Sequence, residues 1–339
     1  MQPQTALDNT MPQGSVVLVT GANGFIASHV VEALLAAGYK VRGTTRTTSK
    51  LATLQARWHK KFGLDSFETV AVEDITKEGA FDMALQGVSG VAHIASPTTF
   101  STNPAEVIEP SVNGTLSILR SAAKVSSIKR FVLTSSSTAA LWPKQNVEFD
   151  VGEDTWNEES PALASSLPED HPLKPWHIYS ASKTLGERAA WNFMKEQKPT
   201  FTLNTVLPDT NFGPILDPQQ PASTAGLLRQ AFNGDIKPLL FVPPQWFVDV
   251  RDTADIHLAA LTSPTLAAGG ARIWAAAGPF NINDVLKALR NLYPKKTFPD
   301  DVEGIERDLS RIDNKRGGEL LGGWRSLEDA VRANTEDLV

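Results

Sequence analysis

A glycine-rich turn between an apolar run and a helical pattern constrains this chain more than any other feature. The short run Val16-Val-Leu-Val-Thr20 is typical of a buried strand, and the apolar positions of residues 25–37 repeat with the period of a helix. Between them, Gly21 and Gly24 let the backbone approach a pyrophosphate, and the helix N-terminus offers N–H groups and a partial positive charge. The spacing Gly-x-x-Gly-x-x-Ala, ending at Ala27, differs from the Gly-x-Gly-x-x-Gly of other dinucleotide folds. The turn therefore predicts a strand, a phosphate-binding turn and a helix.

Strands and helices are predicted to alternate up to residue 207. Further strands are predicted at residues 39–45, 67–73, 90–95, 130–135 and 200–207, and helices at 50–62, 80–86, 105–123 and 179–195. Such alternation favours an α/β fold of the Rossmann type, with a doubly wound parallel sheet and right-handed crossovers. After residue 208 the pattern breaks into Pro- and Gly-rich loops with short elements.

This pattern predicts how the chain is divided. We expect a flexible N-terminal tail over residues 1–14 and a dinucleotide-binding Rossmann domain over 15–207. An insert at 141–178 is expected to lie near the active site. Residues 208–339 are expected to form mainly a smaller C-terminal substrate lobe, with some segments returning to the Rossmann domain.

Composition narrows the kind of partner. The 339 residues carry a net charge of -6 with an isoelectric point near 5.6, so no surface-wide positive field exists to attract nucleic acid. The chain has no cysteine, and its six histidines are not spaced as metal ligands, which argues against thiolate chemistry and metal catalysis. Every apolar run ends well short of the roughly 18 residues of a membrane span, and the N-terminus lacks the features of a signal peptide. We expect a cytoplasmic protein that binds a small molecule, without nucleic-acid or membrane partners.

Tyr179 and Lys183 lie four residues apart in a predicted helix, so they share one of its faces. An ammonium beside a phenol favours the phenolate and moves its pKa from about 10 toward neutrality. A tyrosine tuned in this way can protonate an alkoxide as hydride arrives. On its own such a pair also suits an ordinary amphipathic helix. Downstream of the glycine turn, the pair predicts a proton donor beside a bound dinucleotide.

Basic residues after the second predicted strand indicate which dinucleotide is bound. An NAD enzyme usually has an Asp or Glu there to accept from the ribose 2′-hydroxyl, but this chain has no acidic residue between Glu32 and Asp65. Arg46 follows the strand directly and Lys50 comes soon after it, and both can bind a 2′-phosphate by charge-assisted hydrogen bonds. The sequence therefore predicts NADPH as the cofactor.

Short motifs occur in a characteristic order along the chain. They are Thr20-Gly-x-x-Gly-x-x-Ala27, Ile94-Ala-Ser96, Leu133-Thr-Ser-Ser136, Tyr179-x-x-x-Lys183, Val206-Leu-Pro208 and Phe247-Val-Asp-Val-Arg-Asp252. In this order they resemble the extended short-chain dehydrogenase/reductases, and within these the dihydroflavonol 4-reductase-like branch. The stretches Leu292-Tyr-Pro-x-Lys-Thr-Phe-Pro299 and Gly323-Trp-Arg-Ser326 are similar to those of the fungal and yeast NADPH-dependent aldehyde reductase II, or carbonyl reductase, group.

The resemblance implies a set of site residues. Tyr179 would be the general acid in reduction, Lys183 would bind the nicotinamide ribose and lower the tyrosine pKa, and Ser136 would be the catalytic serine, with Ser135 as an alternative. The implied cofactor-binding residues, besides Tyr179 and Lys183, are Gly21, Asn23, Gly24, Phe25 and Ile26 at the turn, Arg46 and Lys50 at the 2′-phosphate, Asp74 and Ile75 at the adenine, Ala95, Ser96 and Pro208 around the nicotinamide and its ribose, and Thr134.

One departure from the family concerns proton resupply. Many of these enzymes have an asparagine that joins a water relay to the lysine, and Ser111 occupies the matching place here. The resemblance therefore leaves open a route to Tyr179 through the ribose hydroxyl, Lys183 and water held by backbone groups.

The substrate pocket is predicted to be mostly apolar and aromatic. The implied substrate residues are Phe100, Trp176, Val242 and Gln245, with Gln245 as the polar contact. Other apolar side chains of the insert, Leu141, Trp142 and Trp156, are predicted either to line the pocket or to form core. A pocket with few fixed polar groups discriminates weakly, so we expect a broad-range reductase of aldehydes and ketones that uses NADPH and a proton from Tyr179.

Two alternative functions remain at this stage. One is a nucleotide-sugar epimerase or dehydratase on the same fold, which usually holds NAD through an acidic residue after the second strand. The other is a protein that senses NADPH without turnover, although such proteins often lose the tyrosine or the lysine, and both are present here. Both a monomer and a homodimer fit the sequence.

Overall fold

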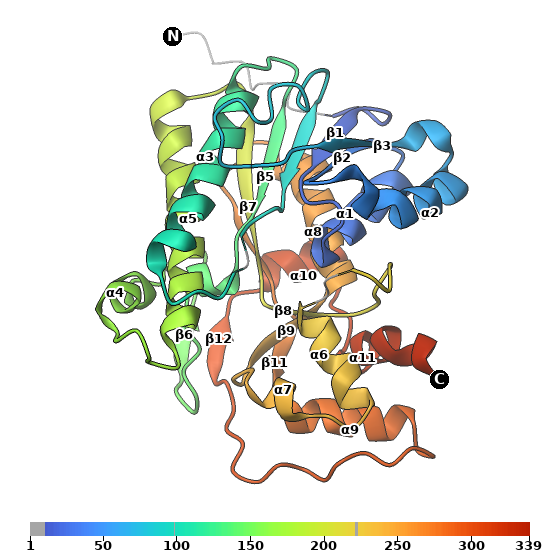
Figure 1. Ribbon diagram of the computed structural model, residues 1–339, viewed down its shortest axis with the longest axis vertical. Helices are drawn as coiled ribbons and strands as arrows, with labels where there is room; N and C mark the ends of the chain where they lie inside the picture. The colour runs from blue at the N-terminus through green and yellow to red at the C-terminus, as the bar shows by residue number, and fades with distance from the viewer. Residues whose placement is uncertain (1–10, 98, 221–222) are drawn as a thin grey trace.

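A parallel sheet of seven strands forms the centre of the protein (Figure 1). The computed structural model describes residues 11–97, 99–220 and 223–339. The strand order is β10-β7-β5-β4-β1-β2-β3, with every neighbouring pair parallel. The strands are β1 (Val16–Val19), β2 (Lys40–Thr45), β3 (Phe67–Ala71), β4 (Gly90–His93), β5 (Arg130–Thr134), β7 (Thr202–Pro208) and β10 (Arg272–Ala275). The predicted doubly wound α/β fold is confirmed.

Helices cover both faces of this sheet. The helices are α1 (Phe25–Ala36), α2 (Ala52–Phe62) and α8 (Val250–Thr262) on one face and α3 (Ile108–Ala123) and α5 (Lys174–Gln197) on the other (Figure 1). Two separate apolar clusters fill the spaces between sheet and helices, one around Leu34 and Trp58 and the other around Ile118 and Phe131. Because both faces are buried, the central strands are continuous apolar runs rather than alternating ones.

The C-terminal part of the chain forms a smaller lobe at the carboxyl edge of the large sheet (Figure 1). Its elements are β8 (Thr210–Phe212), α6 (Ser223–Phe232), α7 (Lys237–Leu240), β9 (Gln245–Asp249), β11 (Gly278–Phe280), α9 (Ile282–Leu292) and α11 (Leu327–Thr335). The three strands pair in the order β11-β9-β8, and a cluster that includes Phe212, Phe247 and Leu286 forms the core of the lobe. The chain returns to the large sheet through α8, β10 and α10 (Lys315–Leu321).

The insert between β5 and β7 folds against the C-terminal half of the chain. It contains β6 (Phe149–Val151), α4 (Glu159–Ser166) and the first turns of α5. β6 pairs in parallel with β12 (Ser310–Ile312), and α4 packs on α5. The insert is thereby fixed from both sides next to the carboxyl end of β5.

Three local expectations need correction. Residues 80–86 form successive turns rather than the predicted helix, because Gly79 (φ +74°) and Gly87 (φ +71°) close the segment at both ends before a helix can propagate. α5 begins at Lys174, so Tyr179 lies inside the helix instead of at its start. Residues 1–10 of the predicted tail lie outside the described part of the chain, whereas Met11 is buried and accepts a hydrogen bond from Tyr39 Oη.

Candidate active site

Tyr179 and Lys183 lie on the same face of α5, at the carboxyl edge of the sheet. The helix begins with a proline in its first turn, where a missing N–H costs nothing. It buries residues such as Ile178 and Ala181 against the fold, which leaves Tyr179 and Lys183 half-buried. The Lys183 Nζ atom is 5.7 Å from the centre of the Tyr179 ring. The predicted juxtaposition of ammonium and phenol is therefore present.

The pKa of Tyr179 does not move in the predicted direction. Withdrawal from water raises the pKa of Tyr179, a hydrogen bond with Ser136 opposes this, and the charge of Asp209 raises it further. Burial also lowers the pKa of Lys183 to about 8, so the ammonium is still charged at pH 7. The pKa of Tyr179 is thus raised and not lowered in this structure, with burial as the largest cause. A protonated phenol at neutral pH is the form that can act as an acid.

The serines after β5 have different partners. Ser136 hydrogen-bonds Tyr179, and its Oγ accepts from the Thr138 backbone N and Oγ1. Ser135 is turned the other way, and its Oγ donates to Glu187 Oε2 at 2.7 Å. The geometry thus separates two residues that the sequence left as alternatives, and only Ser136 is directed toward the tyrosine.

Glu187 is a buried carboxylate that the sequence analysis missed. It accepts from Ser135, Thr205 Oγ1 and Trp191 Nε1, and it forms an ion pair with Arg272 at 2.8 Å. Both charged side chains are nearly inaccessible, with 0% of Glu187 and 7% of Arg272 exposed. The spacing Tyr-x-x-x-Lys-x-x-x-Glu was the available signal, since positions four apart share a helix face. The pair ties α5 to β5, β7 and β10 directly beneath the serine turn.

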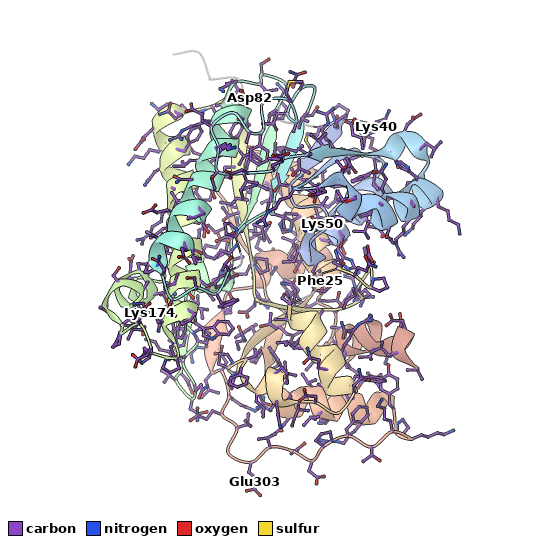
Figure 2. All side chains as sticks on the ribbon, in the orientation of Figure 1. Phe25, Lys40, Lys50, Asp82, Lys174 and Glu303 are labelled. Atoms are coloured by element: carbon purple, nitrogen blue, oxygen red, sulfur yellow. The ribbon has the colours of Figure 1, made fainter. Side chains whose placement is uncertain are left out.

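The glycine turn fits a dinucleotide. Gly21 has φ of +65°, and a Cβ there would lie 3.2 Å from the Cβ of Ala95, so the turn needs glycine for both reasons. α1 has Gly24 as its N-cap and no side-chain cap within the described structure, which leaves N–H groups of its first turn available to a phosphate. Asn23 Oδ1 accepts from Thr45 Oγ1 at the end of β2. Figure 2 shows Phe25 near the boundary between the sheet domain and the smaller lobe.

Arg46 and Lys50, the residues predicted to bind a 2′-phosphate, lie close together in sequence just after β2. Arg46 follows β2 directly, and Lys50 is in the short helical turn Thr48–Leu51. Both side chains are exposed, and neither forms an ion pair with any described residue. Arg46 also contributes to the lowered pKa of Asp74, whose carboxylate mainly accepts from Thr76. These cations are therefore free to bind an anionic group at the end of β2.

The remaining predicted cofactor residues line the same edge, with one exception. Ile75 packs on the backbone of α3 at Gly114, Ala95 faces Gly21, Ser96 follows it, and Pro208 ends β7. Thr20 Oγ1 accepts from the backbone N of Ala95 and so fixes the end of β4. Thr134 is the exception, because its buried hydroxyl is 2.7 Å from His257 Nε2 and serves the protein interior.

A small cavity lies beside Lys183. Its lining includes Ser111, Ser96, Ser135 and Lys183, and its volume is about 20 Å³, enough for a single water molecule. The Ser111 hydroxyl is buried and has no hydrogen-bond partner in the described structure. Ser111, the position that the family resemblance matches to an asparagine, therefore lines a polar cavity together with Lys183, and this is consistent with a water-mediated route to the lysine.

Phe100 and Trp176 form an aromatic wall over Tyr179. The Phe100 ring stacks on Tyr179 with centroids 5.5 Å apart and meets Trp176 edge-on at 4.8 Å. Phe100 keeps 51% of its surface exposed, so this wall faces the solvent side of the site. Val242 and Gln245 lie on the smaller lobe, half-buried, with the Gln245 amide donating to Pro243 O at 3.3 Å.

The other apolar side chains of the insert pack against neighbouring residues. The Arg272 guanidinium lies over the Trp156 ring at 3.9 Å, Trp142 stacks on His177 at 3.9 Å, and Leu141 belongs to a buried cluster. Of the two roles that the sequence left open for them, Leu141 has the core role, whereas Trp142 and Trp156 are half-buried.

Asp209 is a second buried carboxyl near the tyrosine that the sequence did not reveal. It directly follows Pro208, is 9% exposed, and takes hydrogen bonds from Ser137 and from the Thr210 backbone N. Burial raises the pKa of Asp209 to about 7, with a further contribution from the charge of Asp308. No spacing rule in the sequence indicates this carboxyl. Asp209 follows β7, and it lies near the serine turn and Tyr179 because β7 pairs with β5 in the folded sheet.

Known proteins resemble this chain in sequence and structure. The NAD dependent epimerase/dehydratase family matches residues 17–274. Aldehyde reductase 2 of Sporidiobolus salmonicolor is 50% identical over 335 residues, covering 96% of this chain and 97% of that protein. Ketoreductase adrE of Penicillium rubens is 41% identical over 297 residues, covering 85% and 84%. The structure of the yeast methylglyoxal/isovaleraldehyde reductase Gre2 complexed with NADPH superimposes with a TM-score of 0.80 at 30% identity, covering 95% of this chain and 98% of that one.

The doubly wound sheet, the glycine turn and the Tyr-x-x-x-Lys helix define a nicotinamide-dependent oxidoreductase. The chain belongs to the NAD dependent epimerase/dehydratase family, that is, to the extended short-chain dehydrogenase/reductases. This confirms the predicted family, and the NADPH-bound relative agrees with the predicted cofactor. Across the described ranges, no helix is long and apolar enough to cross a membrane, and no group of acidic and histidine side chains is arranged to hold a metal ion.

Proposed function

We propose that this protein reduces aldehydes and ketones to alcohols with NADPH, over a broad range of substrates. The observation that carries the proposal is the phenol of Tyr179, which hydrogen-bonds Ser136 and lies under the Phe100 ring at the carboxyl edge of the sheet. Ligands bind at this edge in open α/β folds. Relatives over most of the chain are named aldehyde reductase and ketoreductase, which supports the same chemistry.

In this mechanism the protein positions and protonates the carbonyl group. The glycine turn would hold NADPH, with Arg46 and Lys50 at its 2′-phosphate. NADPH would supply a hydride to the carbonyl carbon of the substrate. Ser136 donates a hydrogen bond to the carbonyl oxygen and stabilises the charge that develops there. Tyr179 transfers its proton to that oxygen, which completes the alcohol. Lys183 lies beside the phenol, where its charge favours the phenolate that remains.

Substrate range follows from the nature of the walls. Phe100 and Trp176 offer aromatic surface, Val242 is aliphatic, and Gln245 is the polar group that we assign to substrate contact. Apolar contacts of this kind distinguish substrates by only about 1–3 kcal/mol per methylene. We therefore assign no single substrate class beyond carbonyl compounds with apolar or aryl substituents.

Initial rates of NADPH and NADH oxidation test the proposal. The panel contains aryl ketones, β-keto esters and aldehydes, with a nucleotide sugar as the epimerase control. We expect turnover of several carbonyl compounds, a strong preference for NADPH, and no conversion of the nucleotide sugar. Tight NADPH binding without turnover of any carbonyl compound would contradict the proposal and favour the sensor alternative. The monomer or homodimer and the cytoplasmic location remain predictions.

A further inference from the structure

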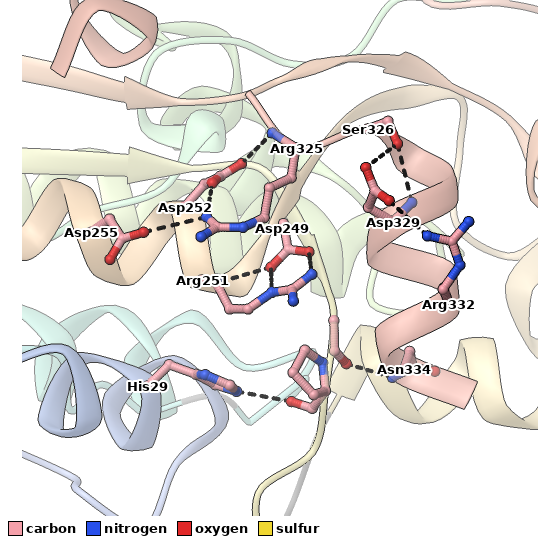
Figure 3. Close-up of polar contacts among 12 residues, drawn as sticks. His29, Asp249, Arg251, Asp252, Asp255, Arg325, Ser326, Asp329, Arg332 and Asn334 are labelled. Atoms are coloured by element: carbon pink, nitrogen blue, oxygen red, sulfur yellow. Dashed lines mark hydrogen bonds and ion pairs between the residues drawn. The ribbon is translucent and has the colours of Figure 1, made fainter. Parts of the chain in front are cut away.

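A segment of the smaller lobe crosses the N-terminal end of α1. After β8, residues 213–220 lead toward α6 and are held on two sides. Asn334 Nδ2 of α11 donates to Gly213 O at 2.7 Å, and His29 Nε2 of α1 contacts Pro214 O at 2.8 Å (Figure 3). Burial lowers the pKa of His29 to about 4, so the ring is neutral and donates one proton to this carbonyl. The segment is thus fixed against the helix that starts at the glycine turn.

Gln220, at the end of this segment, reaches the glycine turn itself. Its Nε2 atom donates to Asn23 O at 3.0 Å, to Gly24 O at 2.8 Å and to Ser28 Oγ at 2.8 Å. The residue is only 9% exposed. Its Oε1 atom is buried and accepts no hydrogen bond from the described residues. A buried acceptor without a partner is costly.

These contacts control the direction of backbone N–H groups. A peptide unit is planar, so fixing the carbonyl oxygen of one residue also fixes the N–H of the next. Gly24 O also accepts from the Ser28 N–H at 2.9 Å, and Gln220 adds a second contact that holds the direction of the Phe25 N–H in the uncapped first turn of α1. By holding Asn23 O, Gln220 also fixes the preceding peptide, whose own N–H donates from Gly24 to Gly21 O at 2.8 Å within the turn. A phosphate at a helix N-terminus is bound through N–H groups of this kind.

We propose that Gln220 is a positioning residue for NADPH: its carboxamide locks the glycine turn in the conformation that presents the first N–H groups of α1 to the cofactor diphosphate. The inference depends on NADPH binding and not on the reduction of any carbonyl compound. It also assigns a role to the smaller lobe in cofactor binding, because residue 220 belongs to that lobe and the turn belongs to the sheet domain.

Binding measurements on three variants test this inference. Gln220→Ala removes the carboxamide, and Gln220→Glu keeps the shape but replaces the donor by a carboxylate that faces two carbonyl oxygens. Gln219→Ala is the matched control, because that side chain is exposed and next in sequence. Calorimetry gives the dissociation constants of NADPH and of 2′-AMP, which carries the 2′-phosphate but no diphosphate.

We expect the dissociation constant of NADPH to be about tenfold higher for Gln220→Ala, because the variant loses the hydrogen bonds that orient the N–H groups facing the diphosphate. Gln220→Glu should be weaker still because of repulsion between its carboxylate and the diphosphate, and Gln219→Ala should match the parent. Affinity for 2′-AMP should be unchanged in every variant. Unchanged NADPH affinity in Gln220→Ala would overturn the proposal, and so would a parallel loss of NADPH and 2′-AMP binding, which would indicate general damage to the fold. If Gln220→Ala does not fold, Gln220→Met, of similar shape without the donor, decides by the same criteria.

Discussion

Alanine substitutions at Ser136 and Ser135 should affect different properties: Ser136→Ala should mainly lower kcat, and Ser135→Ala should mainly lower the stability of the fold. Ser136 hydrogen-bonds the phenol of Tyr179 and is the donor assigned to the carbonyl oxygen. Loss of one donor to a developing oxyanion lowers kcat by roughly 10²–10³, or about 2.7–4 kcal/mol. Ser136→Ala should show a fall of that size and lose only about 1 kcal/mol of unfolding free energy, because the hydroxyl caps the Thr138 N–H but its removal leaves no buried charge unpaired.

Ser135→Ala should destabilise the protein instead. Its hydroxyl donates to the buried Glu187 carboxylate at 2.7 Å, and a hydrogen bond to a charged group contributes about 1.5–3 kcal/mol. Because Glu187 keeps Arg272, Thr205 and Trp191 as partners, we expect the lower end of this range, with kcat near the parent value.

The assay combines steady-state kinetics at saturating NADPH with urea unfolding of each variant. Single-turnover rates confirm that the change lies in the chemical step rather than in product release. A low kcat for Ser135→Ala together with the parent kcat for Ser136→Ala would refute the assignment of Ser136 as the donor to the carbonyl oxygen.

Three further predictions follow from the charged groups. Arg46→Ala should raise the dissociation constant of NADPH by about 10- to 100-fold and leave that of NADH unchanged, as for the loss of a charge-assisted contact; equal losses for both would contradict the 2′-phosphate assignment. The charge of Asp209 raises the pKa of Tyr179, so Asp209→Asn should move the alkaline loss of reductase activity to lower pH by about one unit; a shift to higher pH would show that the sign is wrong. Glu187→Ala should cost about 3–5 kcal/mol of stability by leaving Arg272 buried and unpaired, and adding Arg272→Met should restore part of it; thermal unfolding of the single and double variants checks this.

The sequence predicted the elements that depend on local patterns. Six of the seven strands of the large sheet, the glycine turn and the Tyr179 helix have strong local signals, because apolar runs, glycine spacing and helical periodicity are properties of neighbouring residues. The seventh strand, β10, was not predicted, because its four residues are a short run that joins the sheet only by pairing with β7. The segment 80–86 shows the limit of that approach. Its apolar positions fit a helix, and most of their side chains are buried against β4 and α3. The backbone nevertheless forms turns, because a glycine with positive φ bounds the segment at each end.

The site could be predicted less completely than the fold. Tyr179, Lys183, Arg46 and the turn could be proposed from the sequence because their spacing along the chain has a chemical meaning. Asp209 and Gln220 were missed because their contacts with the site are made between segments distant in sequence, with Gln220 nearly 200 positions from Gly24. The pKa of Tyr179 was predicted with the wrong sign because burial, which no local pattern reports, is the largest cause of its shift.

Replacing Tyr179 by phenylalanine tests the central claim most directly. The variant keeps the ring that stacks on Phe100 and removes only the hydroxyl that donates the proton. With NADPH binding measured separately, the account predicts an unchanged dissociation constant and a fall in kcat of roughly 10²–10⁴, the usual contribution of a general acid. A Tyr179→Phe protein that reduces ketones at the parent rate would contradict it.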